Sequence, residues 1–580
     1  MLLFLLILCL ISLFFFIPAS CYRRQSSFLK RFCDEGFTIC CATVFVDLLP
    51  DINLPRGFSA HSCTDWRPSS GTEGEFFLGV AGPVLNDFGS VAFYGTVTGH
   101  PSYSEGLWSE GVGTELTLVA RERDAAPDTD ATFERFNDGI FSLHLSNSGH
   151  TGFMATLYHG FDGGGNRGFW RHHVDTGSEL VARTVTQAPG TELGTKFSGA
   201  SIFGVRIETL NDSGQTAFMS FLTAVSGGDR GVWSEGGNNG LELLGRNVGF
   251  VPGGTGEPRF SSLGDPVLND IGHVALSALL LDPDTNFWLG HGIVSDRGGN
   301  GLEVVVPPTL PAPGTDAGVI LYPGQSKPAF NNLDQLAFLA SLDGPGVVDA
   351  NDQGIWSEGS GSGLSLVARE GNQAPGTDVG VSFSSLGTPV INSIGQTAFQ
   401  SELVGAGVDA TNGRGIWSEK EGTGLTLVAR NGDLALGAGD GVYFSGLGKF
   451  VLNGNGQTAF WSSLVGSGVD TINDKSIWAE DISGNLQLIA REGDLLDVDD
   501  GSGTDFRTIR DLIFSSPGPS TGNEDGHTSA FNEYGQLAFN AIFTDGTSGV
   551  FVSNLVATPE PSTLLLGLLA FTGLLISKRR

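Results

Sequence analysis

An acidic, glycine-containing loop near the C-terminal end carries the residues best suited to bind an ion. Asp497, Asp499, Asp500 and Asp505 lie within one short stretch of the chain. Carboxylate oxygens on such a loop are ligands that Ca²⁺ prefers. The order of residues departs from an EF-hand loop, which needs glycine at the sixth place and glutamate at the twelfth. Calcium is therefore one hypothesis for this loop, a solvated acidic turn is the other, and no further cofactor is expected.

Histidines gather in one part of the chain and suggest a second kind of metal site. Half of the ten lie close together, at His144, His150, His159, His172 and His173. Neighbouring residues of a strand point to opposite faces, so His172 and His173 would not readily serve the same metal.

Nucleophile motifs do not support catalysis. One Gly-x-Ser-x-Gly match spans residues 518–522, but it lies in a Pro/Ser-rich loop and not on the strand-to-helix turn that a serine nucleophile needs. The sequence contains no phosphate-binding glycine loop, no His-Glu-x-x-His and no Cys-x-x-Cys. We therefore predict no catalytic residue.

These candidates sit within a tandem repeat. The motif Asn-x-x-Gly-x-x-Ala-Phe and its degenerate copies begin at Asn86, Ser146, Asn211, Asn269, Asn331, Asn392, Asn453 and Asn532. The last interval is the longest, and it contains the acidic loop. A regular period of this length is typical of a solenoid, a propeller or an array.

A second signature follows each motif, Gly-Ile-Trp-Ser-Glu and then Leu-x-Leu-Val-Ala-Arg. The aromatic place is held by Trp108, Trp170, Trp233, Trp356, Trp417 and Trp478. A residue that recurs in nearly every unit is better explained by packing between units than by a role as a sugar platform. The recurrent Glu and Arg are expected to pair across strands and set the register, at little gain in energy if exposed.

Alternation of apolar and polar residues over short runs, bounded by Gly, Asn and Asp, predicts strands throughout 72–556. Asn bonds its own backbone in the turn, and Gly supplies a positive φ. Four strands per unit in eight units predict an all-β fold, a β-propeller of about eight four-stranded blades. Seven blades or a β-solenoid remain alternatives. A strand at about 76–85 precedes the first motif, so an N-terminal strand is expected to complete the C-terminal blade.

The composition of the chain limits the classes of molecule that it is expected to bind. The 580 residues carry a formal net charge of −32, which disfavours nucleic acid and anionic membrane surfaces. All six cysteines lie within the first 63 residues, so packing and not disulfides must stabilise the repeats.

The two ends of the chain indicate export. Residues 1–21 contain an apolar run followed by Pro18-Ala19-Ser20, typical of a signal peptide or an N-terminal anchor, and 22–71 is a poorly defined leader. At 557–580, Pro559-Glu560-Pro561 precedes an apolar span, predicted to be a transmembrane helix, and then Lys578-Arg579-Arg580. An ordinary tail anchor is the alternative interpretation of this tail.

This order of parts resembles the PEP-CTERM sorting signal of bacterial surface proteins. The resemblance implies that an exosortase-type enzyme recognises and removes the tail, often in bacteria that make extracellular polysaccharide. The repeats resemble the tandem NxxGxxAF family of bacterial surface proteins, which implies a surface location and no established catalytic activity.

Two functions follow as hypotheses. One is an exported, non-enzymatic propeller at the cell surface or in the extracellular matrix, which binds polysaccharide or protein or acts only as a structural spacer. The other is a propeller glycan hydrolase or lyase outside the cell, which would need two carboxylates converging at the centre of the ring.

Overall fold

The computed structural model describes residues 58–59, 76–98, 103–113, 115–136, 143–158, 166–198, 206–207, 209–223, 229–237, 239–247, 258–299, 301–420, 422–499, 503–514, 525–527 and 529–556. They belong to the larger of two units of the chain, Gly57–Arg580. The predicted signal segment, most of the predicted leader and the predicted sorting tail lie outside them. Within the described ranges, no helix has the length and apolarity needed to cross a membrane.

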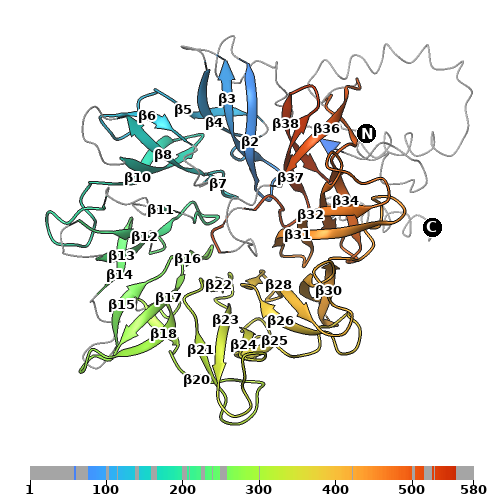
Figure 1. The fold of residues 1–580 in the computed structure, drawn as a ribbon. Helices are drawn as coiled ribbons and strands as arrows, with labels where there is room; N and C mark the ends of the chain where they lie inside the picture. The colour runs from blue at the N-terminus through green and yellow to red at the C-terminus, as the bar shows by residue number, and fades with distance from the viewer. Residues whose placement is uncertain are drawn as a thin grey trace, which may run out of the picture. The chain divides into compact units, whose positions relative to one another are not determined.

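Eight antiparallel sheets make up the described part of the chain, and they surround a common centre (Figure 1). The predicted all-β propeller with eight blades is therefore confirmed. In each blade the strands are hydrogen-bonded in the order first, second, third, fourth. The Asn-x-x-Gly turn joins the first strand to the second, and we call the place where the eight turns meet the hub.

The first strands precede the turns and are in several blades divided into two pieces by a bulge or bend. They are β2 (Phe77–Leu85), β6 (Thr132–Arg135) with β7 (Leu143–Leu145), β11 (Arg206–Ile207), β15 (Arg259–Leu263) with β16 (Val267–Leu268), β21 (Ile320–Pro323) with β22 (Ala329–Phe330), β26 (Ser382–Leu386) with β27 (Val390–Ile391), β31 (Val442–Leu452) and β36 (Phe506–Ile513).

The second strands carry the Ala-Phe pair. They are β3 (Val91–Thr98), β8 (Thr151–Tyr158), β12 (Ala217–Phe221), β17 (Val274–Leu281), β23 (Leu336–Asp343), β28 (Thr397–Val404), β32 (Thr458–Gly466) and β37 (Leu537–Phe543). The third strands carry the Trp or its replacement. They are β4 (Tyr103–Ser109), β9 (Arg167–His173), β13 (Arg230–Ser234), β18 (Trp288–Ser295), β24 (Gln353–Ser357), β29 (Arg414–Lys420), β33 (Lys475–Glu480) and β38 (Ser548–Ser553).

The fourth strands carry the Leu-Val-Ala-Arg sequence or a variant of it in seven blades. They are β5 (Thr117–Arg121), β10 (Gly177–Arg183), β14 (Glu242–Arg246), β19 (Glu303–Val306), β25 (Ser365–Arg369), β30 (Gly424–Arg430) and β34 (Leu486–Arg491). Each pairs with its third strand through a register shift, a β-bulge that the alternating pattern did not reveal. Two short extra strands, β20 (Leu310–Pro311) and β35 (Leu495–Asp497), pair with first strands at the blade edge.

The ring closes with strands from both ends of the chain. In the eighth blade the fourth strand is β1 (Phe58–Ser59), which pairs antiparallel with β38. An N-terminal strand thus completes the C-terminal blade as predicted, but this strand lies in the segment predicted to be a leader. The strand expected for this role, β2, opens the first blade instead.

The turn at the hub follows the chemistry predicted for it. In blade 6, Oδ1 of Asn392 accepts the backbone N–H of Gln396 at 2.8 Å, and the same bond recurs in other turns. The glycine three places on has a φ between 77° and 93° in seven turns. Asp334 takes this place in blade 5 with a φ of 59°.

The other end of each asparagine links neighbouring blades. Its Nδ2 donates to the carbonyl oxygen of the equivalent residue in the next blade. These links run from Asn86 to Ser146 (3.3 Å), Asn211 to Asn269 (3.0 Å), Asn269 to Asn331 (3.0 Å), Asn331 to Asn392 (2.9 Å), Asn392 to Asn453 (2.9 Å), Asn453 to Asn532 (3.0 Å) and Asn532 to Asn86 (2.9 Å). We call this set the amide ring. Ser146 has no amide to donate, so only the step from blade 2 to blade 3 lacks this link.

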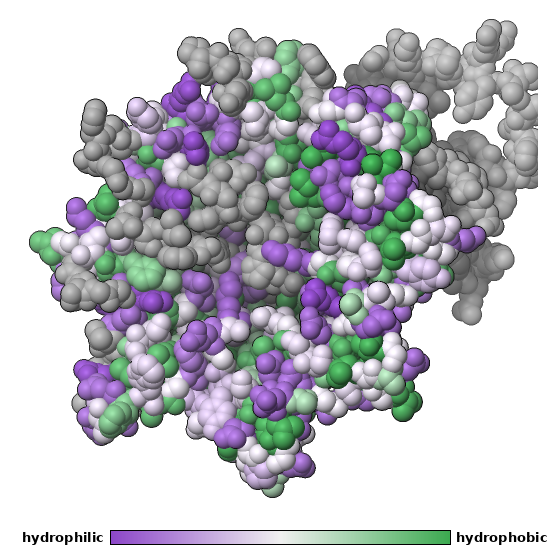
Figure 2. Space-filling model, viewed as in Figure 1, coloured by the Kyte–Doolittle hydropathy of each residue, from purple (hydrophilic) through white to green (hydrophobic). Residues whose placement is uncertain are grey.

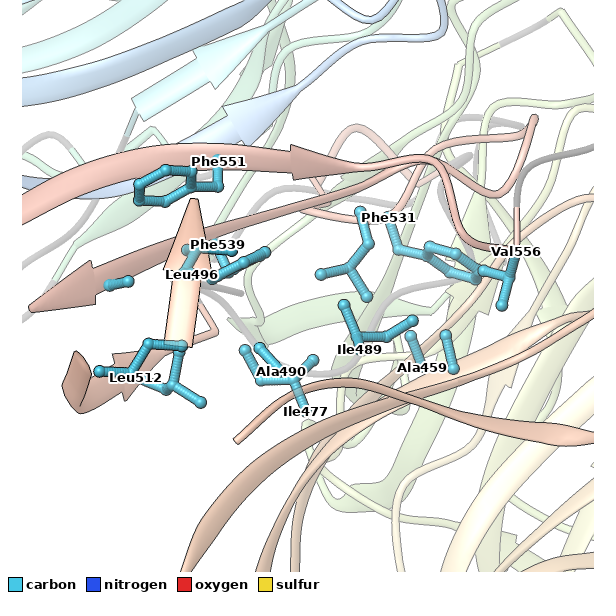
Figure 3. Close-up of a cluster of buried hydrophobic side chains, with 14 of the residues drawn as sticks. Ala459, Ile477, Ile489, Ala490, Leu496, Leu512, Phe531, Phe539, Phe551 and Val556 are labelled. Atoms are coloured by element: carbon cyan, nitrogen blue, oxygen red, sulfur yellow. The ribbon is translucent and has the colours of Figure 1, made fainter. Parts of the chain in front are cut away.

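The six recurrent tryptophans pack between blades, as predicted, and each is fully buried. In blade 6 the Trp417 ring meets Phe383 edge-on at 5.0 Å and joins Ile355 and Ala368 of blade 5 in one apolar cluster. Its indole N–H donates to the carbonyl of Pro375, in the Ala-Pro-Gly-Thr loop that leads into the blade. The boundary between blades 7 and 8 lacks a Trp and is filled by aliphatic residues and phenylalanines (Figure 3).

The predicted pairing of the recurrent Glu with the recurrent Arg is wrong. Glu419 accepts the backbone N–H of Thr397 in its own blade at 2.9 Å, and Glu358 in blade 5 makes the same bond to Leu336. Arg430 instead donates to the carbonyl of Asn412, in the loop before the third strand. Both residues satisfy backbone groups where the strands end, which explains why they recur without facing each other.

Asn392→Ser tests the amide ring, because Ser146 shows that the turn tolerates serine: its Oγ accepts the N–H of His150 at 3.0 Å. The variant keeps an acceptor within the turn and loses the donor to Asn453. We expect the free energy of unfolding to fall by about 1–3 kcal/mol, measured by denaturant unfolding followed through Trp fluorescence. Asn372→Ser, at an exposed position, is the matched control. An equal change in both variants would show that the link does not stabilise the ring.

Candidate functional site

The residue that follows each amide-ring position lies at the hub, and in six of the eight blades it takes part in a second set of bonds between blades. These residues are Asp87, Asn147, Asp212, Asp270, Asn332, Ser393, Gly454 and Glu533. Four of them are acidic, and we call these four the hub carboxylates. Hydrophilic residues also lie around the middle of the face shown in Figure 2.

Backbone N–H groups of one turn are satisfied by side chains of the next. The N–H of Glu533 donates to Asp87 at 2.9 Å, and that of Asp87 donates to Asn147 at 2.7 Å. The chain of bonds continues through Asp212 and Asp270 toward blade 5. At Gly454, an added Cβ would lie 1.7 Å from Oε2 of Glu533, so the glycine leaves room for this carboxylate.

Two hub carboxylates lie on either side of one amide. Nδ2 of Asn147 donates to Oδ2 of Asp87 and to Oδ2 of Asp212, each at 2.6 Å. The two oxygens therefore lie no farther apart than twice that distance. Because Asn147 stands between them, the pair is held in a fixed geometry and the space between the carboxylates is filled.

A segment of the last repeat lies inside the amide ring. The carbonyl of Gly526 accepts the N–H of Leu210 at 2.8 Å, and that of Ser529 accepts the N–H of Leu85 at 3.2 Å. Leu210 and Leu85 immediately precede ring asparagines, so residues 525–527 and 529–531, the hub segment, cross the centre. Between this segment and the hub carboxylates lies a recess that opens to solvent, in which the centre of a water-sized sphere can move through about 50 Å³.

Burial and mutual repulsion shift the protonation of the hub. Burial raises the pKa of Asp212 to about 7, and the charges of Asp270 and Asp87 add to the rise against the hydrogen bonds from Asn147. Burial also raises the pKa of Asp87 and of Asp270 above the ordinary value of 3.8. The hub therefore changes its charge in the neutral to mildly acidic range.

A histidine of the hub segment is held neutral. Burial, the charge of Lys327 and that of His144 lower the pKa of His527 well below its ordinary value. Nζ of Lys327 donates to Nε2 of His527 at 2.6 Å. The contact between Lys327 and His527 joins the hub segment to blade 5.

The predicted calcium loop lies elsewhere, on the hairpin of β35 and β36. Oδ1 of Asp497 accepts the N–H groups of Asp499 and Asp505, at 3.2 and 2.9 Å, and Asp505 forms an ion pair with Arg507 at 2.8 Å. Asp500 lies outside the described residues. In the part of the chain that the structure describes, no three His, Cys, Asp or Glu side chains are arranged to hold a metal ion.

The predicted histidine group is only partly brought together. The rings of His150 and His173 lie 4.8 Å apart, whereas Nδ1 of His172 bonds to Ser178 at 2.9 Å. Burial and the charges of His173 and Arg171 lower the pKa of His150 to about 4. His159, the Gly-x-Ser-x-Gly loop and the sorting residues Pro559, Glu560, Pro561, Lys578, Arg579 and Arg580 lie outside the described residues.

The hub carboxylates were not predicted, because they do not recur from one repeat to the next. The place after the ring asparagine varies among Asp, Asn, Ser, Gly and Glu, so it contributes no signature. A signal was nevertheless present, since six of the eight copies carry a carboxylate or an amide there. The last and longest interval of the repeat does contain the hub segment, although not at its acidic loop.

Comparisons with known proteins add a family. The family of unknown function DUF7453 matches residues 65–435 and 414–565. No curated protein matches the sequence.

Some solved structures are similar in part. The periplasmic gluconolactonase PpgL of Pseudomonas aeruginosa is 14% identical over 70% of this chain and 97% of its own, with a TM-score of 0.26. The acylaminoacyl peptidase of Pyrococcus horikoshii is 9% identical over 71% of this chain and 52% of its own, with a TM-score of 0.26. The GH43 protein BlXynB of Bacillus licheniformis is 9% identical over 87% of this chain and 97% of its own, with a TM-score of 0.18.

Asp212→Asn tests the charge of the hub. Folding raises the pKa of Asp212, so protonated Asp212 stabilises the folded protein. This stabilisation is complete below about pH 3.8 and is lost as the pH rises toward 7. We expect the melting temperature of the protein to fall between pH 5 and pH 8, and to fall less in the variant, by differential scanning calorimetry. Asp316→Asn, at an exposed loop position, should keep the original profile. A variant with the full original pH dependence would contradict the assignment.

Proposed function

Because the chain belongs to DUF7453, a family of unknown function, we propose a function from its own residues: an exported surface or matrix propeller that binds or supports other molecules without catalysis. The proposal joins the eight-bladed body to the sorting tail at 557–580, which would be recognised by an exosortase-type enzyme. Before processing, the apolar span of the tail would anchor the protein in the membrane. Polysaccharide or protein of the matrix is the expected partner, and nucleic acid is not.

The main support for this proposal is that the hub carboxylates are engaged in hydrogen bonds between blades. A propeller enzyme would place its acid and base at the centre of the ring, free to reach a substrate. Here both oxygens of Asp87, of Asp212 and of Asp270 accept hydrogen bonds from neighbouring turns. Such carboxylates join blades, and Asn147 occupies the place between Asp87 and Asp212. This supports a role for the ring as a rigid body with outward-facing surfaces.

One observation favours the second candidate function, a glycan hydrolase or lyase. The Asp87 and Asp212 oxygens that flank Asn147 lie no farther apart than twice 2.6 Å, and retaining glycosidases hold their two carboxyl groups about 5–5.5 Å apart. A carboxyl with its pKa raised to about 7 is suited to act as a general acid. Asn147 stands between the two groups, however, at the place that the glycosidic oxygen would need.

Export and sorting are tested at the tail. Replacing Pro559, Glu560 and Pro561 by alanine leaves the apolar span and the basic cluster intact. In the native host we expect the unaltered protein to end near residues 559–561 in surface and medium fractions, and the variant to remain in the membrane with Arg580 in place. Mass spectrometry of the C-terminal peptide measures both. An intact Arg580 in the unaltered protein would instead identify an ordinary tail anchor.

Catalysis is tested on polysaccharides with and without uronic acids. We expect the purified protein to release no reducing ends and no unsaturated uronates beyond the level of an Asp87→Asn, Asp212→Asn double variant. The physical reason is that Asn147 lies between the two carboxyl groups and donates to both of them. Release by the unaltered protein that the double variant lacks would establish the enzyme and overturn the non-enzymatic proposal.

A further inference from the structure

Large apolar side chains are exposed around the hub, directly after the residues that face it. Phe88, Ile271, Leu333 and Ile394 occupy the third place of their turns and are 70%, 54%, 61% and 55% exposed. The same place holds Ser148, Ser213, Asn455 and the half-buried Tyr534 in the other turns. We call these four exposed side chains the apolar crown.

The crown is divided into two arcs. Ile271, Leu333 and Ile394 belong to blades 4, 5 and 6, whose turns are joined in succession by the amide ring. Phe88 in blade 1 lies beside the blade 8 turn with Tyr534, since Asn532 donates to Asn86. Polar residues of blades 2, 3 and 7 separate the arcs. A segment laid across the hub would therefore touch apolar side chains at both of its ends.

Folding gives no reason for this exposure. The turn requires only asparagine at the first place and a positive φ at the fourth, and serine or asparagine serves at the third place in blades 2, 3 and 7. Apolar side chains kept in water around one centre are typical of an interaction surface.

The negative charge between the two arcs indicates a partner that carries a cationic group. Asp87, Asp212, Asp270 and Glu533 line the pocket at the centre, and the whole chain carries a formal charge of −32. Carboxylates gathered in a recess focus a negative potential and attract cationic groups. An alkyl chain that ends in a cation, such as lysine or arginine, matches both parts, because its stem packs on apolar groups while its head meets carboxylates.

On the basis of the proposed binding function, we infer that the apolar crown and the hub carboxylates form a docking surface for a protein segment that carries lysine or arginine between apolar residues. The apolar residues of the segment rest on the two arcs, and the basic side chain points into the recess between them. A neutral polysaccharide would leave the carboxylates without a counter-charge, so it fits this surface less well.

The test measures binding of a fluorescent peptide, acetyl-Leu-Leu-Lys-Leu-Leu-amide, to the purified protein by anisotropy. Two peptides serve as controls, one with Glu in place of Lys and one with Ser in place of every Leu. We expect the Lys peptide to bind at least about tenfold more tightly than either control and to weaken as salt is added. Equal binding of the Glu peptide, or no measurable binding of the Lys peptide, would overturn the inference.

Variants locate the binding site. Ile271→Ser with Leu333→Ser removes one arc at exposed positions, and Asp212→Asn with Asp270→Asn lowers the charge. Each pair should weaken binding by about tenfold. Leu193→Ser with Val379→Ser, both 98% exposed on other loops, is the matched control and should change nothing. Hydrogen exchange on the unaltered protein checks the location without mutation, since the peptide should protect the turns at 269–272 and 331–334.

Unchanged binding in both pairs, or protection confined to other parts of the ring, would overturn the inference. These results do not depend on the tail, since sorting is judged from the mature C-terminus in the host. A normally processed protein that fails to bind the peptide would refute the docking surface alone. A bound peptide with an unprocessed tail would refute sorting alone.

Discussion

The amide ring is the constraint on which the rest of the structure depends. One side chain acts twice: its oxygen closes the turn within a blade, and its nitrogen donates to the next blade. Both atoms are buried, so replacing the residue would leave backbone groups without partners. Asparagine is the smallest residue with an acceptor and a donor on one planar group, which explains why it and not aspartate begins the repeat. Blade spacing at the centre follows from the length of this link.

Around that centre the blades meet through apolar packing. Each Trp of a third strand lies between the sheets, and the loop that enters the blade accepts the N–H of Trp170, Trp233, Trp356 and Trp417. Within the described residues, two boundaries lack a Trp: residues such as Phe531 and Phe551 fill the one between blades 7 and 8 (Figure 3), and Phe260 with aliphatic residues fills the one between blades 3 and 4. The ring therefore has a polar centre that fixes the angles and apolar boundaries that provide most of the burial.

Sequence reasoning reached the fold because strands, turns and the Trp packing each leave a local, recurring pattern. The second strands, the Asn and Gly turns and the number of blades were all predicted from that pattern. The hub carboxylates were not, because Asp87 and Asp212 lie 125 positions apart in a place without a fixed residue type. The sequence predicted that β2 closes the ring, whereas β1 does so. The two residues of β1 are too short a run to show a strand pattern. The calcium loop was chosen for its composition alone, whereas backbone N–H groups occupy Asp497 in the structure.

The single serine in the amide ring has a consequence for the symmetry of the molecule. Between blades 2 and 3 no amide donates from Ser146, and the turns are joined instead by Asn147 and Ser148, which donate to Asp212. The other seven boundaries keep a link made of groups that are uncharged at every pH. The boundary between blades 2 and 3 is thus the one whose contacts at the hub depend on an ionisable group, Asp212. A change in pH therefore acts on this pair of blades before it acts on the other blades.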